Sequence, residues 1–199
     1  MRDAVSTAVA GLVLTGGASR RLGIDKATLR LAGESLADRT ARVLKGVADP
    51  VLEVGPGHTA LEAVREADPG AGPLAAMAAG GAALAARGAG ERAVLVVAVD
   101  MPALDPALLR FLVAAPPADA VVPRVDGRAQ VLCARYSPGA LVRAATLVRA
   151  GERSVHALLG AGVVAWVDEP EWGRVTTAAC FADVDTPEDA HAIGLEGPG

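Results

Sequence analysis

The fold is set by one short segment at residues 8–17, which reads Ala8-Val9-Ala10-Gly11-Leu12-Val13-Leu14-Thr15-Gly16-Gly17. It is a run of small and branched apolar residues that ends in a threonine and two glycines. This pattern is typical of a buried parallel strand that leads into a loop. Four more apolar runs end abruptly at glycine, proline or aspartate, at residues 51–54, 93–99, 120–122 and 162–167. We therefore predict at least five strands, each followed by a loop.

Helical patterns lie between and after these runs. They cover residues 35–47, 72–87, 106–114, 139–150, 154–159 and 186–193. Strands that alternate with helices indicate βαβ units, in which a mostly parallel sheet is covered by helices on both faces. We predict an α/β fold with a single three-layer α/β/α domain at residues 1–194, followed by a flexible tail at residues 195–199.

Composition narrows the class of protein. The chain has 199 residues, 52% of them hydrophobic but only 3% aromatic, so the core must consist mainly of Ala, Val and Leu. A net charge of −4 with scattered Lys and Arg argues against nucleic acid or a membrane surface as a partner. With no secretory signal and no apolar run of about 20 residues, we expect a cytoplasmic protein. We expect Cys133 and Cys180 to be buried thiols, Trp166 to pack under the sheet and Trp172 to be partly exposed.

The loop at residues 15–26 follows the first strand, where ligands bind in parallel sheets, beyond the carboxyl ends of the strands. Its glycines allow a ligand to approach the backbone closely, and Arg20, Arg21 and Lys26 can neutralise phosphate charge. It is not a P-loop, because Ile24 and Asp25 precede the lysine. These residue types favour a polyphosphate site, although they also fit a tight turn followed by a solvated basic loop.

The spacing within this loop resembles a family signature. The segments Leu14-Thr15-Gly16-Gly17, Ser19-Arg20-Arg21-Leu22-Gly23 and Asp25-Lys26-Ala27 are similar to the LxGGxSxRxGxDK motif of the molybdenum cofactor guanylyltransferases, a MobA-like family of nucleotidyltransferases. Later segments follow in the family's order: Gly72-Pro73-Leu74-Ala75, Asp100-Met101-Pro102 and Asp183-Val184-Asp185-Thr186-Pro187-Glu188-Asp189. The resemblance covers nearly the whole chain. It implies the Rossmann-like fold of nucleotide-diphospho-sugar and related nucleotidyltransferases.

The resemblance also implies a reaction and a set of site residues. A member of this family uses Mg²⁺ to transfer GMP from GTP to a phosphorylated acceptor, here expected to be molybdopterin, and releases pyrophosphate. Transient contacts with molybdenum insertion proteins or molybdoenzymes are expected as well. The implied phosphate-holding residues are Lys26, Arg20 and Arg21, and the implied magnesium ligand is Asp100. The residues implied to contact the nucleotide are Leu14, Thr15, Gly16, Gly17, Lys26, Asp68 and Asp100.

Several aspartates have a second interpretation. Asp100 directly follows a buried strand, which suits a magnesium ligand, but it could also cap the next helix or form an Asx turn before Pro102. Asp183 and Asp185 stand where the family often has asparagine. Their oxygens could bind the metal, or Asp185 or Thr186 could cap the last helix. We expect Asp105, before Pro106, to be an N-cap without a chemical role.

Other functions are weighed against this one. A cytidylyltransferase or a sugar-phosphate nucleotidyltransferase would share the fold, and the two glycines after Thr15 favour guanine over cytosine by family resemblance. Val54 stands where the family commonly has asparagine, so the base preference stays open. The segment Gly55-Pro56-Gly57-His58-Thr59-Ala60 matches GxGxxA, which raises an NAD-type or non-catalytic dinucleotide binder, although Pro56 counts against it. We expect no partner at metal or triad spacing for His58, His156 and His191.

Overall fold

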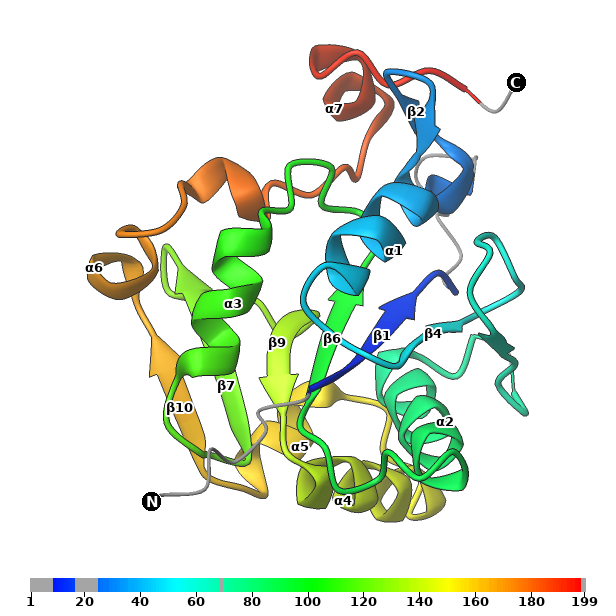
Figure 1. Ribbon diagram of the computed structural model, residues 1–199, viewed down its shortest axis with the longest axis vertical. Helices are drawn as coiled ribbons and strands as arrows, with labels where there is room; N and C mark the ends of the chain where they lie inside the picture. The colour runs from blue at the N-terminus through cyan, green and yellow to red at the C-terminus, as the bar shows by residue number, and fades with distance from the viewer. Residues whose placement is uncertain (1–8, 17–24, 69, 198–199) are drawn as a thin grey trace, which may run out of the picture.

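The computed structural model describes residues 9–16, 25–68 and 70–197. An eight-stranded sheet forms its centre, with the order β10-β7-β9-β6-β1-β4-β5 and with β8 paired to β7 (Figure 1). Its strands are β1 (Ala10–Leu14), β4 (Val51–Val54), β5 (Ala63–Val64), β6 (Val94–Ala98), β7 (Ala120–Val125), β8 (Arg128–Ala129), β9 (Cys133–Tyr136) and β10 (Val164–Val167). A separate hairpin joins β2 (Arg30–Leu31) to β3 (Glu34–Ser35).

The sheet is mostly parallel, as predicted. β1 pairs in parallel with β4 and β6, and β10 pairs in parallel with β7. The exception in the middle of the sheet is β9, which runs antiparallel to both β6 and β7. The sequence did not predict this strand, because a buried arginine, Arg135, interrupts its apolar pattern.

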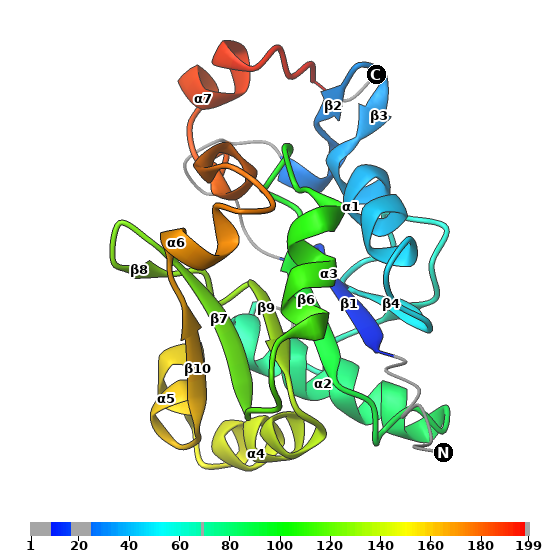
Figure 2. The same ribbon diagram turned by 60° about the vertical axis from the view of Figure 1, so that its left-hand side comes forward.

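Helices cover both faces of the sheet, which confirms the three-layer prediction (Figures 1 and 2). One face is covered by α1 (Leu36–Lys45), α3 (Pro106–Ala114) and α6 (Glu169–Trp172), and the other by α2 (Pro73–Ala86), α4 (Pro138–Arg149) and α5 (Val155–Gly160). The short 3-10 helices η1 (Lys26–Thr28) and η2 (Ala178–Phe181) and the helix α7 (Pro187–Ala192) complete the set in the described residues. None of the described helices is long and apolar enough to cross a membrane.

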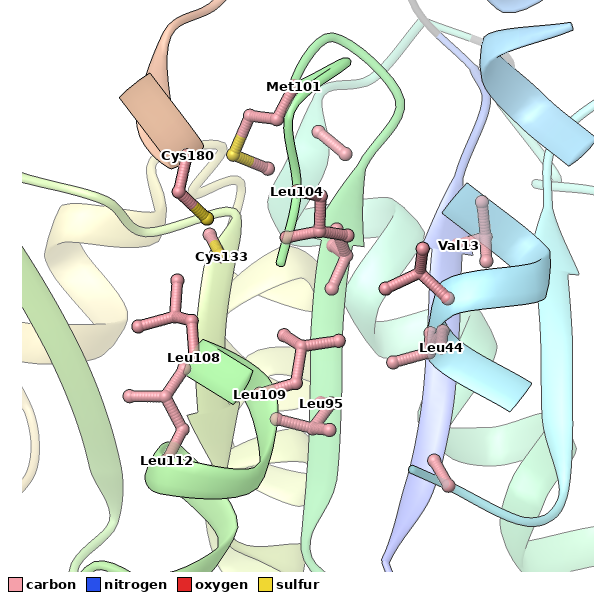
Figure 3. Close-up of a cluster of buried hydrophobic side chains, with 14 of the residues drawn as sticks. Val13, Leu44, Leu95, Met101, Leu104, Leu108, Leu109, Leu112, Cys133 and Cys180 are labelled. Atoms are coloured by element: carbon pink, nitrogen blue, oxygen red, sulfur yellow. The ribbon is translucent and has the colours of Figure 1, made fainter. Parts of the chain in front are cut away.

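The strands of the centre bury side chains on both faces. In β1, Val13 packs into the cluster under α1 and α3, whereas Leu12 packs into the cluster under α2 and α4. Figure 3 shows the first cluster, in which Leu108 of α3 lies near Cys133, and Leu109 of α3 packs near Leu95 of β6. The thiols of Cys133 and Cys180 are both buried, as predicted. On the second face, a Cβ on Gly80 of α2 would lie 2.5 Å from Leu12 Cδ1, so glycine permits this close packing.

The two tryptophans take the opposite places to those predicted. Trp172 is 1% exposed and packs edge-to-face on Phe181, with 5.1 Å between the ring centroids. Trp166 is 39% exposed because it lies on the edge strand β10, and the Arg124 guanidinium lies 5.2 Å from the centroid of its ring. The edge position of β10 exposes Trp166, and packing of α6 against the first core cluster buries Trp172; the local sequence encodes neither.

Leu195 and Glu196, near the end of the chain, make contacts with the rest of the fold. Glu196 exchanges two backbone hydrogen bonds with Arg30, at 3.0 and 2.8 Å. Leu195 packs with a small apolar cluster around Leu36 and Val184. The first two residues of the tail that we predicted from residue 195 therefore lie against the β2–β3 hairpin.

Candidate active site

The register of the sheet brings three loops to one edge. Leu14, the last residue of β1, pairs with Val54 of β4 and Ala98 of β6. Because these strands are parallel, the segments that follow them all leave from the carboxyl edge of the sheet. A cavity of about 450 Å³ opens there, lined by Leu14, Thr15, Gly16, Lys26, Glu66 and Asp100 among others. Gly72, whose φ of 102° favours glycine, also lines it where α2 begins.

Lys26 is positioned by its neighbour in the chain. Asp25 caps η1 by accepting a 3.0 Å hydrogen bond from the backbone N–H of Ala27. Its other carboxylate oxygen lies 2.9 Å from Nε2 of His58, a structural contact that joins this turn to the loop after β4. With its turn fixed in this way, Lys26 places its ammonium nitrogen 2.6 Å from Oδ1 of Asp185 and 3.7 Å from Oδ2 of Asp100.

Asp100 follows β6 at the floor of the cavity, with its side chain 31% exposed. Burial raises the pKa of this carboxyl group above its ordinary value; the Lys26 ammonium opposes the rise, and Asp183 and Asp185 add to it. The alternative that Asp100 caps the next helix is wrong. Asp105 is the N-cap of α3, as predicted, because its Oδ1 accepts a 2.7 Å hydrogen bond from Ala107.

Asp183 and Asp185 are brought beside Asp100 from a distant part of the chain. The backbone N–H of Val184, between them, donates a 3.0 Å hydrogen bond to the carbonyl oxygen of Asp100. Thr186 caps α7 in a capping box with Asp189, so Thr186 rather than Asp185 is the N-cap of this helix. Asp185 instead uses its carboxylate to bind Lys26.

This arrangement fits a magnesium ion that arrives with a nucleotide. Mg²⁺ is usually held by one or two carboxylates, while substrate phosphates and waters supply the remaining ligands. Asp100 offers such a carboxylate at the carboxyl edge of the sheet, with the Lys26 ammonium 3.7 Å from its Oδ2. Among the described residues, no cluster of three or more His, Cys, Asp or Glu side chains could hold a metal without other ligands. The protein groups therefore suit a shared site rather than a closed one.

The acidic residue at the far side of the cavity is Glu66, not Asp68 as the sequence suggested. Asp68 is exposed and lines a neighbouring cavity between α2 and α4. Glu66 lines the main cavity, and its Oε2 lies 3.2 Å from where a Cβ on Gly16 would be. Its Oε1 is buried without a hydrogen-bond partner among the described residues. Burial, followed by the nearby charge of Asp68, raises the pKa of Glu66.

The sequence signal for Glu66 is weak. From its spacing to Gly72-Pro73-Leu74, we had expected Asp68 to be the acidic residue that contacts the nucleotide. The structure shows that Glu66 closely follows β5, which pairs in parallel with β4 and so leads to the same sheet edge as β1. A strand of two residues leaves no readable periodicity.

Glu53 explains the GxGxxA loop. This side chain is fully buried, and it accepts hydrogen bonds from the hydroxyl of Thr15 at 2.6 Å and from the backbone N–H groups of Gly57, His58 and Thr59 at 2.9, 2.7 and 2.8 Å. Burial disfavours its charged form, but the bonds from Thr15, His58 and Thr59 prevail and hold the pKa of Glu53 below its ordinary value.

A dinucleotide site at this loop is therefore contradicted. The N–H groups that would bind a pyrophosphate are already bonded to Glu53. The loop also leads into β5 rather than into a helix whose N-terminus could face an anion. Its role is structural, since it fixes Thr15 at the end of β1.

The predicted site residues thus divide into three groups. The cavity brings together Leu14, Thr15, Gly16, Lys26 and Asp100, and Asp183 and Asp185 lie beside it. Asp68 lies outside the cavity. Gly17, Arg20 and Arg21 lie outside the described residues.

Comparison with known proteins agrees with this geometry. Residues 11–186 match the family model described as the MobA-like NTP transferase domain. A probable molybdenum cofactor guanylyltransferase of Opitutus terrae is 42% identical over 205 residues, which cover 96% of this chain and 100% of that protein.

Solved structures share the fold. Molybdopterin-guanine dinucleotide biosynthesis protein A of Archaeoglobus fulgidus superposes with a TM-score of 0.78 at 22% identity, covering 93% of this chain and 96% of that one. A Mycobacterium tuberculosis protein, Rv0371c, solved in complex with manganese, superposes with a TM-score of 0.61 at 17% identity, covering 94% of this chain and 97% of that one. The matched model and the Opitutus relative show that the chain belongs to the MobA-like NTP transferase domain family.

Proposed function

We propose that this protein transfers GMP from GTP to the terminal phosphate of molybdopterin and releases pyrophosphate. The observation that carries the proposal is the placement of Lys26 against Asp100 and Asp185 in the cavity that follows β1. The name of the Opitutus terrae relative supports both GTP as the donor and the molybdenum cofactor pathway.

The chain's own groups position the donor phosphates. Lys26 exchanges a carboxylate partner for a phosphate oxygen, and the glycines after Thr15 let the triphosphate approach the backbone. Arg20 and Arg21, which lie outside the described residues, are proposed to hold further phosphate oxygens. Asp100, with Asp183 or Asp185, would hold Mg²⁺, which when bound neutralises charge on the phosphate oxygens. The manganese complex of the Mycobacterium tuberculosis neighbour supports a divalent ion in this fold.

The reaction needs no protein nucleophile. The acceptor's phosphate oxygen attacks the α-phosphorus of GTP, a new P–O bond forms, and the bond to the β-phosphate oxygen breaks with the electron pair leaving on pyrophosphate. An ionised phosphate is already nucleophilic, so catalysis depends on alignment and charge neutralisation. The residues named above supply both.

Glu66 is proposed to bind the nucleoside part of GTP. A carboxylate repels phosphate, whereas it accepts hydrogen bonds from ribose hydroxyls or from the N–H groups of guanine. Its Oε1 lacks a partner among the described residues, which supports a role in binding a donor group of the ligand. We further propose that the enzyme acts in the cytoplasm, where GTP and Mg²⁺ are available.

A nucleotide panel tests the function. The protein is given GTP, CTP, ATP or UTP with Mg²⁺ and molybdopterin, and pyrophosphate release is measured. We expect release with GTP well above that with the other nucleotides. Release with CTP alone would identify a cytidylyltransferase, and release with GTP and a sugar phosphate but not molybdopterin would identify a sugar nucleotide enzyme. Either result would contradict the proposal.

A further inference from the structure

A second cavity also borders Asp100. It has a volume of about 450 Å³ and shares Asp100 and Leu132 with the nucleotide cavity. The turn between β7 and β8 and the start of β8 form one wall, and Phe181 and Asp183 contribute to another. Asp100 therefore borders two separate spaces, which suits a reaction in which two substrates meet at one carboxylate.

We propose that this second cavity receives the acceptor and that Arg128 binds the acceptor's phosphate monoester. This inference rests on the proposed function, because it assigns the second substrate of the same reaction. Three aspartates line the cavity, namely Asp100, Asp126 and Asp183, and Arg128 is the one cation among its described lining residues. A phosphate placed there needs a cation, and the planar guanidinium group binds phosphate with two parallel hydrogen bonds.

Arg128 is available for this role. Its residue is exposed, and no carboxylate of the described chain lies within ion-pair distance of its guanidinium group. Several other described arginines have such partners, and several do not. Arg124, on the neighbouring strand, is bound to Asp168, and Arg143 is bound to Asp119. Arg128 is therefore a cation in the wall of this cavity whose guanidinium group can bind an anionic ligand.

The local backbone holds Arg128 in place. The two residues of the turn, Asp126 and Gly127, both have positive φ, at 49° and 76°. This is the backbone of a type I′ turn, which Asp-Gly favours and whose twist matches that of a hairpin. Arg128 pairs with Val125 across the hairpin, and the next turn is fixed by a 2.8 Å bond from Gln130 N–H to the Pro123 carbonyl. The backbone at Arg128 is thus held by the β7–β8 hairpin, which lies beside α6 in Figure 2.

The geometry gives each substrate its own cation. Lys26 lines the nucleotide cavity, and Arg128 lines the second cavity. Asp183 faces the second cavity, while Asp185 is bonded to Lys26. A phosphate between Arg128 and Asp100 would therefore lie beside the nucleotide cavity, because Asp100 lines both cavities.

The test separates the acceptor from the donor. R128A, R128K and R128Q are compared with the wild type for KM of molybdopterin, kcat, and Kd of GTP measured by titration calorimetry. For R128A we expect KM of the acceptor to rise about 10- to 100-fold, because a charge-assisted contact is lost, while Kd of GTP stays within about twofold. R128K should restore part of the loss. R110A removes an exposed arginine of α3 outside both cavities and should behave as the wild type.

The outcomes distinguish the two proposals. An unchanged acceptor KM in R128A and R128Q, with the wild type active, would overturn the role of Arg128 but leave the function intact. An equal loss of affinity for GTP and acceptor would also overturn it, because the effect would not be specific to one substrate. No pyrophosphate release by the wild type with GTP and molybdopterin would remove the proposed function, and this inference with it. Circular dichroism identifies any variant that fails to fold. If R128A and R128Q fail to fold, R128K is compared with the wild type for the same constants.

Discussion

The backbone N–H of Val184 donates a 3.0 Å hydrogen bond to the carbonyl oxygen of Asp100, across 84 positions of the chain. Val184 itself is buried, so the contact is shielded from water. Its two neighbours are aspartates, and one lines the second cavity while the other binds Lys26. A single backbone bond therefore ties the last segment of the fold to the acid at the centre of the site.

Replacing Asp100 with Asn should abolish Mg²⁺-dependent pyrophosphate release. We expect kcat to fall by about 10³-fold or more, because the carboxylate that holds the metal is lost while the shape of the side chain is kept. The free energy of unfolding should change little, since burial already disfavours the charge of this group. Activity and chemical denaturation are measured side by side. D168N, at an exposed ion pair with Arg124, is the control, and near-normal turnover in D100N would remove this residue from the mechanism.

Replacing Lys26 with Ala should weaken GTP binding by about 10- to 100-fold, because a charge-assisted contact to phosphate is lost. Titration calorimetry with GTP and Mg²⁺ measures the change. Lys45, the other lysine of the chain, is exposed at the end of α1, and K45A provides a matched control. Equal GTP affinities in K26A and K45A would show that the loop after β1 does not hold the nucleotide.

The isosteric variants E66Q and D68N should differ in their affinity for GTP. E66Q is expected to lower GTP affinity by about tenfold, the effect of one charged hydrogen bond, whereas D68N should leave it unchanged. Stability should not fall in E66Q, because burial makes the charged form of Glu66 unfavourable in the folded protein. If D68N rather than E66Q lost affinity, the assignment from the cavity would be wrong.

The pH dependence of GTP binding gives a second check on Glu66. Its raised pKa means that the carboxylate takes up a proton at a higher pH than an ordinary glutamate does. The affinity ratio between the wild type and E66Q should therefore shrink as the pH is lowered toward the raised pKa, because the wild type loses the charge that the variant already lacks. Comparing the two proteins at each pH cancels the titration of GTP itself. A ratio that stays constant as the pH is lowered would argue against an ionised Glu66 in the complex.

Glu53 should be a determinant of stability rather than of chemistry. In E53Q the Thr15 hydroxyl and the loop N–H groups lose a charged acceptor, and the NH₂ of the amide faces other donors. We expect a loss of about 2–4 kcal/mol in the free energy of unfolding. The folded pKa of Glu53 lies below the ordinary 4.5, so its contribution is complete above that value and is lost as the pH falls through the folded pKa. Urea denaturation at neutral and acidic pH measures both effects. E62Q, at an exposed ion pair with Arg87, should change stability much less.

Much of the sheet could be read from local sequence. The predicted strands at 51–54 and 93–99 correspond to β4 and β6, and the helix predicted at 106–114 has the observed bounds of α3. Residues near in sequence carry these signals. Apolar runs define buried strands, and the cap at Asp105 followed by Pro106 begins the helix in the way that the sequence indicates.

The strand β9 could not be predicted from its local apolar pattern. Its polar member, Arg135, is 7% exposed, and its guanidinium group donates bonds of 2.8, 2.9 and 2.7 Å to the carbonyl oxygens of Val113, Ala115 and Pro116. These carbonyls lie at the end of α3, where helical partners run out. An arginine is acceptable in this strand only because a distant helix end accepts its hydrogen bonds, which no local pattern reveals.

The sequence by itself determined the strands that lead into the site, the loop that follows β1 and the acid that follows β6, because short-range periodicity and turn chemistry depend on neighbouring residues. Only the tertiary structure decided that Glu66 rather than Asp68 faces Gly16, that Glu53 occupies the amides of the glycine loop, and that Lys26 binds Asp185 across 159 positions. Those choices depend on strand order and register. Both are fixed by packing between segments far apart in the chain, so the sequence near each of these residues does not indicate its contacts.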